Sequence, residues 1–436
     1  RTHGRLKIQI SNYYCLSACQ KNIFGTLTTG QTVDTSTFIE GGVKLKKLFF
    51  LVLSTLFAAS TLLSPSQASA STIDVVAESK SIYLTYFQQG KHVDNTKLGL
   101  THNGYGSKSS VNPGFFRAAQ DGLFLTSLYN RLKANNDPLA ASVRTDAIAT
   151  LDHLKARMDL SKTKHANSWF NNATQSPDTS MLLLAFAKAY GQLDLNSTQK
   201  ANYNSIMNEM LSALQTAKNL HISNGSVDSW IAPSMTSCGA VLKSKASNNI
   251  FALASGGIGA YALYVGGTQN PYRGVMTDFA SYVRDTQLSN GLWLIGGGRE
   301  DSCKMAVGYD TWSVMGSALA GMGSTGVTSN PSSSFFNAAV SGVKGINAHY
   351  VASNGVMREY SNGLTGSGII AEGAAVPAYA LAVSYVGTSD AKALFNTLYP
   401  SAKSSLEPAS AINSDNGTPN FHRLIQGLSG ALDSNF

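Results

Sequence analysis

The feature that most constrains this chain is a polar turn dipeptide that recurs about every 63 residues. The spacings between successive copies are 64, 57, 66, 64 and 62 residues, and an aromatic residue follows most copies within a few positions. The six copies are Asn103-Gly104, Asn167-Ser168, Asn224-Gly225, Asn290-Gly291, Asn354-Gly355 and Asn416-Gly417. Near-constant spacing of this kind indicates repeated structural units, each of which buries its apolar face against its neighbours.

Between consecutive turns the sequence predicts two helices, the first apolar and the second amphipathic. Helix starts are marked by residues that can accept hydrogen bonds from free backbone N–H groups, such as Asp137 ahead of Pro138, and Ser333 and Ser389. The predicted pairs are Phe115 to Leu132 with Leu139 to Met158, Asp178 to Tyr190 with Ser197 to Leu220, Asn248 to Val265 with Tyr272 to Thr286, Asp310 to Met322 with Ser333 to Tyr350, and Gly368 to Tyr385 with Ala391 to Leu406.

The first helix of each pair has too little polar surface to border water and is therefore expected to be buried all round. The second suits an outer layer. If 72–89 supplies the outer helix for a last inner helix from Phe421 to Leu432, six inner and six outer helices result. We therefore predict an all-α fold, an (α/α)6 toroid formed as a single domain by residues 71–436. A solenoid with free ends is the alternative, but it would need polar caps, and both ends here carry apolar faces.

The first 70 residues contain a pattern typical of a secretory signal peptide. Lys44, Lys46 and Lys47 precede the apolar run Leu48 to Leu63, and small residues follow up to Ala70. We expect cleavage after Ala70 and a secreted or periplasmic protein. A membrane anchor is the weaker reading because the run is shorter than the ~20 residues that a bilayer needs. Residues 44–70 then form the leader, and 1–43 are interpreted as mistranslated upstream sequence.

Removal of residues 1–70 changes what the charge implies. It takes away 7 of the 33 Lys and Arg residues and 2 of the 25 Asp and Glu residues, so the net charge falls from +8 to 26 minus 23, or +3. This excludes the strong basic character of a nucleic-acid-binding protein. We expect no nucleic-acid partner, no stable membrane anchor and a monomer.

Two cysteines, Cys238 and Cys303, remain after the leader. In an oxidising compartment they would form one disulfide, and the alternative is two separate thiols. Neither cysteine has a CxxC or histidine partner nearby, so no metal site is expected, and no other cofactor motif is present. The glycine-rich stretch GGIGAYALYVGG lies inside a predicted helix and is interpreted as close helix packing.

In such a ring the inner helices all begin at the same end, which we call the mouth, and the longest loops lie there. Aromatic residues gather in these segments. Aromatic faces suit the apolar face of a sugar ring, although each residue could instead anchor a loop to the rim. The candidate substrate-binding aromatics are Trp169, Trp230, Trp293, Trp312, Tyr105, Tyr309 and Tyr360.

Three carboxyl groups expected at the mouth fit glycoside cleavage, which needs one protonated acid and one ionised base. Glu372 lies about one turn into the most apolar predicted inner helix, where desolvation would keep it protonated as the acid. Asp310 and Asp178 begin inner helices, where the helix dipole would favour the ionised form of a base. Both aspartates could equally be plain helix caps.

A second chemistry uses no carboxylate pair. A polysaccharide lyase abstracts a proton beside a uronate while cationic groups neutralise the acid, and His422 with Arg423, together with Arg117, could serve it. A third possibility is a toroid that binds a glycan or protein without catalysis.

With its six turns and aromatic rim, the segment 71–436 resembles the (α/α)6 carbohydrate-active enzymes, the glycoside hydrolases and polysaccharide lyases built from six helical hairpins. The resemblance is one of architecture and carries over no catalytic residue. It implies a polysaccharide or oligosaccharide bound in an open groove, and commonly inversion of configuration. The leading hypothesis is a secreted glycoside hydrolase that acts in a cleft at the mouth, with a lyase on an acidic polymer as the alternative.

Overall fold

A computed structural model describes residues 72–88, 113–165, 176–223, 226–227, 248–293, 304–351, 357–362, 370–371, 377–406 and 419–436. All of them belong to one compact unit, Ala70–Phe436.

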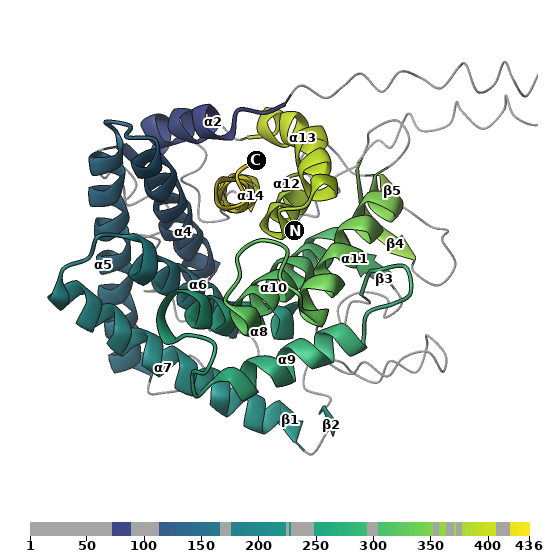
Figure 1. Cartoon of the computed structure of the whole chain (residues 1–436), viewed down its shortest axis with the longest axis horizontal. Helices are drawn as coiled ribbons and strands as arrows, with labels where there is room; N and C mark the ends of the chain where they lie inside the picture. The colour runs from purple at the N-terminus through teal and green to yellow at the C-terminus, as the bar shows by residue number, and fades with distance from the viewer. Residues whose placement is uncertain are drawn as a thin grey trace, which may run out of the picture. The chain divides into compact units, whose positions relative to one another are not determined.

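Six inner helices form a closed ring. Each contacts the next one along the chain, and the last, α14, contacts the first, α4. Figure 1 shows the elements following one another around this ring in chain order. The inner elements are α4 (Pro113–Ala134), α6 (Ser176–Gln192), α8 (Asn248–Tyr261) continued by η6 (Ala262–Gly266), α10 (Val307–Thr325), α12 (Pro377–Ala380) continued by η7 (Leu381–Val386), and α14 (Pro419–Asp433).

Six outer elements cover the ring. Each of the outer helices α5, α7, α9, α11 and α13 packs on the inner helix that precedes it in the chain, and α2 packs on α14. The predicted (α/α)6 toroid is therefore confirmed by the contacts between its helices. The outer elements are α2 (Val75–Ile82) continued by η1 (Tyr83–Phe87), α5 (Ala140–His165), α7 (Ser197–His221), α9 (Arg273–Asp285), α11 (Ser334–Tyr350) and α13 (Ser389–Ser404).

The two layers differ in burial as the sequence predicts. Thirteen of the 14 residues of α8 are buried. With η6 it is long and apolar enough to cross a membrane by length and composition, yet it packs between α6 and α10. In the outer helix α9 the buried residues are Val275, Met276, Phe279, Ala280 and Val283. That spacing leaves one apolar stripe on a helix whose other face is polar.

Glycine allows α8 and α10 to approach backbone to backbone. A Cβ at Gly256 would lie 2.8 Å from the Cα of Gly316, and one at Gly259 would lie 2.4 Å from the carbonyl oxygen of Leu319. Any side chain at these positions would push the helices apart, which explains the glycine-rich stretch as close helix packing.

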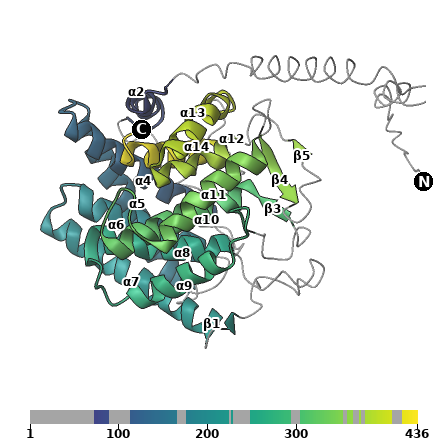
Figure 2. The same cartoon turned by 45° about the vertical axis from the view of Figure 1, so that its right-hand side comes forward.

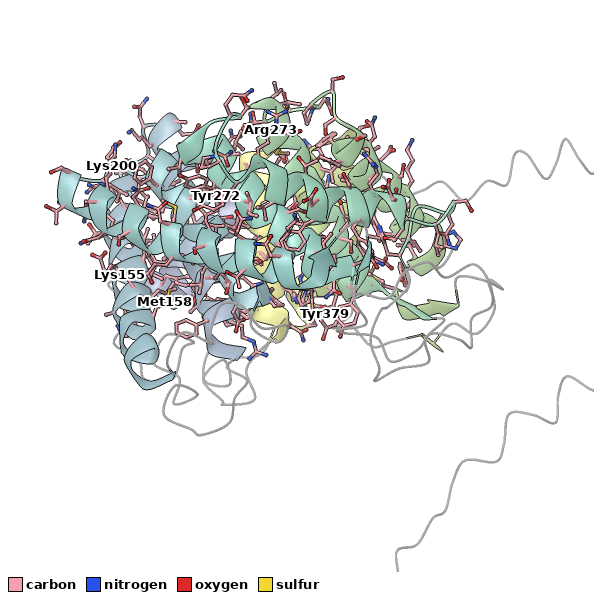
Figure 3. The ribbon with its side chains drawn as sticks, turned by 90° about the horizontal axis from the view of Figure 1, so that it is seen from below. Lys155, Met158, Lys200, Tyr272, Arg273 and Tyr379 are labelled. Carbon is pink, nitrogen blue, oxygen red and sulfur yellow. The ribbon has the colours of Figure 1, made fainter. Side chains whose placement is uncertain are left out.

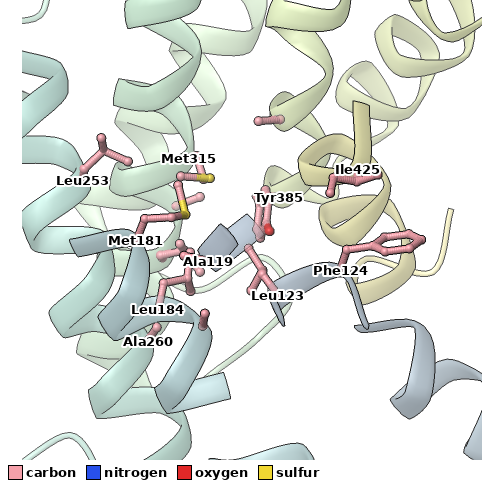
Figure 4. Close-up of a cluster of buried hydrophobic side chains, with 14 of the residues drawn as sticks. Ala119, Leu123, Phe124, Met181, Leu184, Leu253, Ala260, Met315, Tyr385 and Ile425 are labelled. Carbon is pink, nitrogen blue, oxygen red and sulfur yellow. The ribbon is translucent and has the colours of Figure 1, made fainter. Parts of the chain in front are cut away.

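The ring is filled by apolar side chains from all six inner elements, which converge in Figure 4. Those labelled there are Ala119, Leu123 and Phe124 from α4, Met181 and Leu184 from α6, Leu253 and Ala260 from α8, Met315 from α10, Tyr385 from η7 and Ile425 from α14.

The helix starts follow capping chemistry. The side chain of Asn196 accepts a hydrogen bond from the backbone N–H of Gln199, whose own side chain accepts one from the N–H of Asn196. Asp137 accepts a hydrogen bond from the backbone N–H of Leu139 at 2.9 Å. The expected cap at Ser389 is wrong by one residue, because the hydroxyl of Thr388 caps α13 instead.

The repeated turns follow outer helices. Strands β1 (Ile222–Ser223) and β2 (Ser226–Val227) pair on either side of Asn224-Gly225. At the next copy, Gly291 has a φ of +86°, and a Cβ there would lie 2.3 Å from the carbonyl oxygen of Ser341. Only glycine meets both conditions without strain.

A small antiparallel sheet precedes two inner helices. Strand β4 (Arg358–Asn362) lies between β3 (Lys304–Ala306) and β5 (Ile370–Ala371), and Figure 2 shows this sheet beside α10 and α11. The predicted helix from Gly368 is therefore wrong in its first part, because 370–371 pair with β4 and α12 begins at Pro377. Backbone pairing in the sheet overrides the apolar helical pattern there.

Helix α2, with its continuation η1, is joined to its neighbours in the outer layer through polar contacts. The hydroxyl of Tyr83 donates to the carboxylate of Asp146 on α5 at 2.7 Å. Glu78 accepts from the hydroxyl of Tyr399 at 3.0 Å and from the ammonium of Lys403 at 2.6 Å, both on α13. Helix α2, with η1, is therefore bonded to α5 on one side and to α13 on the other.

At the end of the ring opposite the mouth, a buried cation is paired. The ammonium of Lys188 on α6, which is 1% exposed, contacts the carboxylate of Asp433 at the end of α14 and the hydroxyl of Ser127 on α4. This cluster ties three inner helices together where they end.

Candidate functional site

The first turns of five inner helices meet at the mouth. Figure 3 places Tyr379, from the start of α12, near one edge of the ring, and Arg273, from the start of the outer helix α9, near the opposite edge. Inner and outer helices therefore begin at opposite ends, as the toroid requires.

Aromatic rings and an arginine form the centre of the mouth. The ring of Trp312 lies 5.1 Å from that of Phe116 and 5.9 Å from that of Tyr309, between centroids. The guanidinium carbon of Arg423 lies 4.1 Å from the ring centroid of Trp312 and 5.2 Å from that of Tyr379. We call these five residues the mouth cluster. Tyr309 is 39% exposed and the other four are half-buried, so the cluster borders solvent.

Several buried polar atoms at the mouth have no hydrogen-bond partner within the described part of the chain. They are Trp312 Nε1, Arg423 Nη1, Asn420 Oδ1 and Asp121 Oδ1. Buried polar groups in native proteins are nearly always satisfied, because an unsatisfied one costs about 1–3 kcal/mol. Four of them on the inner helices α4, α10 and α14 indicate a place where a ligand or water supplies the missing partners.

Burial also acts on the charge of Arg423. Desolvation, with the nearby charge of Arg117 as a smaller contribution, lowers the pKa of the Arg423 guanidinium to about 10. The group remains cationic at neutral pH. Arg117 itself is half-buried in the first turns of α4.

Asp178 brings a carboxyl group to the same region. It lies in the first turn of α6, is 8% exposed, and accepts a hydrogen bond from the backbone N–H of Phe116. Desolvation raises its pKa well above the usual value of 3.8. This is the reverse of the expected effect of the helix dipole, because removal from water outweighs the dipole at a buried site.

Asp310 has both carboxylate oxygens occupied. One accepts from the backbone N–H of Trp293 at 2.8 Å, and the other from the hydroxyl of Tyr350 at the end of α11. Burial raises its pKa to about 7, again against the expectation of a dipole-stabilised anion. Asp310 thus fastens the segment before α10 to the outer layer.

His422 lies next to Arg423 and is 4% exposed. Its Nε2 lies 3.4 Å from Oδ1 of the buried Asp121 on α4, although the angles are not those of a hydrogen bond. The pair places a histidine and a carboxylate beside the mouth cluster.

Trp293 differs from the other predicted aromatics because it is a core residue. It is 2% exposed, its indole N–H donates to the carbonyl of Val283 at 2.7 Å, and its ring fills the space beside Gly342. The expectation that this side chain binds substrate is therefore corrected. Trp293 instead anchors the segment after α9 to α11.

The remaining predicted residues fall outside what can be described. For Tyr360 only the backbone is placed, in β4. Glu372 was expected to be an acid because it lay inside a buried helix. That reason does not hold, since α12 begins five residues later, at Pro377. The residues beyond the described ranges are Glu372, Trp169, Trp230, Tyr105, Cys238 and Cys303.

Two members of the mouth cluster, Phe116 and Tyr379, were not among the predicted site residues. Their signal is positional, since both lie in the first turn of an inner helix, as Asp178 and Asp310 do. Within the described ranges, no three His, Cys, Asp or Glu residues gather closely enough to hold a metal ion.

No family model matches the chain, and no curated protein matches its sequence. Solved structures similar in fold include a sugar epimerase from a ruminal bacterium, with 9% identity and a TM-score of 0.49 over 73% of this chain and 87% of the other. A cellobiose 2-epimerase from Bacillus thermoamylovorans has 10% identity and a TM-score of 0.48 over 76% and 88%. An α-1,6-mannanase from a Salegentibacter species has 12% identity and a TM-score of 0.43 over 83% and 98%. They are carbohydrate-active enzymes of the kind that the sequence resembles, and at these values the likeness concerns the course of the chain alone.

Proposed function

We propose that the protein is a glycoside hydrolase whose substrate lies across the mouth, with a sugar ring against the mouth cluster. Trp312, Tyr309 and Tyr379 offer aromatic surface that borders solvent, which is the surface that the apolar face of a sugar prefers. The unsatisfied atoms Trp312 Nε1 and Asn420 Oδ1 can bond to hydroxyl groups, one as a donor and one as an acceptor.

The observation that carries the proposal is the carboxyl group of Asp178. It is buried beside Phe116, with its pKa raised by desolvation, so it can hold a proton at a pH where an exposed aspartate is ionised. That is the property required of the acid that protonates the departing glycosidic oxygen. Asp178 is accordingly proposed as the general acid, in place of the base expected from the sequence.

Glycoside cleavage also needs an ionised carboxylate to activate water or to attack the sugar. Glu372 is the proposed partner, since it precedes α12 in the chain by five residues and α12 begins at the mouth. Both carboxylate oxygens of Asp310 are engaged by Trp293 and Tyr350, which makes it the weaker candidate. Secretion, cleavage after Ala70 and the Cys238 to Cys303 disulfide remain predictions from the sequence.

The test is a screen of the full chain against neutral and acidic polysaccharides, with reducing ends and ultraviolet absorbance followed together. We expect release of reducing ends without absorbance, and a loss of at least about a hundredfold in kcat/KM for Asp178→Asn. The matched control is Asp146→Asn, which alters another buried aspartate, one whose partner is Tyr83 in the outer layer.

Two outcomes would contradict the proposal. One is full activity in a folded Asp178→Asn variant. The other is new ultraviolet absorbance in step with every cleavage, which marks the unsaturated product of a lyase. Helical circular dichroism of each variant shows whether the ring has formed.

A further inference from the structure

We propose that Arg423 is the binding site for the carboxylate of an acidic sugar, so that the glycan held at the mouth contains uronate residues. The inference rests on the proposed function in one respect only, namely that the mouth binds a glycan. It adds the chemical class of that glycan.

The first observation is a cation that has no counter-ion among the described residues. Within the described residues Arg423 makes no ion pair, and its Nη1 is buried with no acceptor. Lys188, a buried cation at the opposite end of the ring, is by contrast paired with Asp433. Leaving a buried N–H donor of a charged group without an acceptor is costly. We therefore expect a ligand to supply an acceptor for Nη1 of Arg423.

The second observation is how the guanidinium is held. It contacts the ring of Trp312 from α10 and the ring of Tyr379 from α12, which fixes its position through its faces. Contacts of this kind use no N–H donor, and a guanidinium presents a planar fork of donors that matches the two oxygens of a carboxylate. The same rings lie where the face of the sugar would stack, so the charged group and the ring of one residue can be recognised together.

The third observation is the electrostatic setting. Arg117 lies close enough to Arg423 for its charge to lower the pKa of the Arg423 guanidinium, with desolvation as the larger cause. The inner helices add the positive ends of their dipoles at the mouth. A bound carboxylate would stabilise the Arg423 cation in this positive setting, whereas a neutral sugar would not.

A purely structural role for Arg423 makes a different prediction. If it only fastens α14 to α10 and α12 through the two rings, its removal would change the stability of the protein. The charge of a ligand would then have no effect on its affinity. The experiment therefore compares ligands that differ in charge alone. Oligosaccharides of glucuronate and galacturonate are matched with the same chains after their carboxyl groups are reduced to alcohols.

Binding to the full wild-type chain is measured by titration calorimetry and by tryptophan fluorescence, because Trp312 contacts the guanidinium. At least one acidic oligosaccharide is expected to bind about tenfold more tightly than its reduced counterpart, with a preference that weakens as salt is added. Equal affinity for every matched pair would overturn the proposal. This comparison needs no variant, so it stands even if changes at Arg423 impair folding.

Variants then locate the effect. Arg423→Gln should abolish the preference for the acidic ligand, and Arg423→Lys should restore part of it, since it keeps the charge but not the fork. The control is Arg131→Gln, which removes an arginine from the opposite end of α4 and should keep the preference. A folded Arg423→Gln variant that still prefers acidic ligands would overturn the proposal.

The two proposals fail separately. Cleavage of neutral glycans with no preference for acidic ones would retain the proposed hydrolase and overturn the acidic subsite. Tight, charge-dependent binding without any cleavage would retain the subsite and contradict the hydrolase.

Discussion

Asp310→Asn should remove a specific pH dependence from the stability of the ring. The carboxyl group is 1% exposed, and burial raises its pKa from 3.8 to about 7. Between these two values the folded protein holds a proton that the unfolded chain has released. The stabilisation is therefore complete below pH 3.8 and is lost as the pH rises through about 7.

The magnitude follows from the two pKa values. Each unit of difference corresponds to about 1.4 kcal/mol, and between about pH 5 and about pH 8 the group should account for a fall of about 3 kcal/mol in the free energy of unfolding. The amide that this substitution introduces does not titrate in this range, so the difference between wild type and variant isolates this one group from Asp178, Asp433 and the histidines.

The assay is urea denaturation followed by far-ultraviolet circular dichroism at several pH values, for wild type and Asp310→Asn in parallel. A second variant fixes the assignment. Tyr350→Phe removes a hydrogen bond that lowers the pKa of Asp310, so the loss of stability should extend to higher pH. Unfolding free energies that run parallel with pH in wild type and Asp310→Asn would refute the reasoning.

Two further changes test the packing of the ring. Lys188→Ala leaves the carboxylate of Asp433 without its buried partner and should destabilise the protein by about 3 kcal/mol in urea denaturation, whereas an unchanged midpoint would contradict the ion pair. Gly291→Ala places a Cβ against the carbonyl oxygen of Ser341 at a positive φ and should cost about 1–3 kcal/mol in thermal unfolding. Gly274→Ala, at a helical position open to solvent, is its control and should stabilise by about 0.5 kcal/mol, so equal effects of the two would count against the turn.

The fold could be predicted because its signals are local and repeated. The Asn290-Gly291 turn needs a residue at positive φ, and the burial of α8 on all sides follows from its composition. The failures are places where distant residues decide. Residues 370–371 carry an apolar pattern that fits a helix, but pairing with β4 makes them a strand. The helix α13 is capped by Thr388 and not by Ser389, and a sequence pattern does not fix a helix end to within one residue.

The sequence indicated which residues begin the inner helices, but it could not give their surroundings. The sequence predicted both Trp293 and Trp312 at the mouth. In the structure Trp293 is buried because its ring packs beside Gly342, whereas Trp312 is half-buried and borders solvent. The environment of Asp310 depends on Tyr350, which is 40 residues away in the chain. The sequence indicated Arg423 as a cation, and only the ring brings it against the aromatic side chain of Trp312, which lies on another helix.

The polar contacts of α2 have a consequence for how the chain acquires its structure. Glu78 bonds to Tyr399 and Lys403, at sequence separations of 321 and 325 residues. During synthesis α2 emerges long before these partners exist, and the contacts join residues more than 300 positions apart. The joint between α2 and α13 should therefore form only after nearly the whole chain has been made, which slows assembly and leaves this side of α2 without its partners in the meantime.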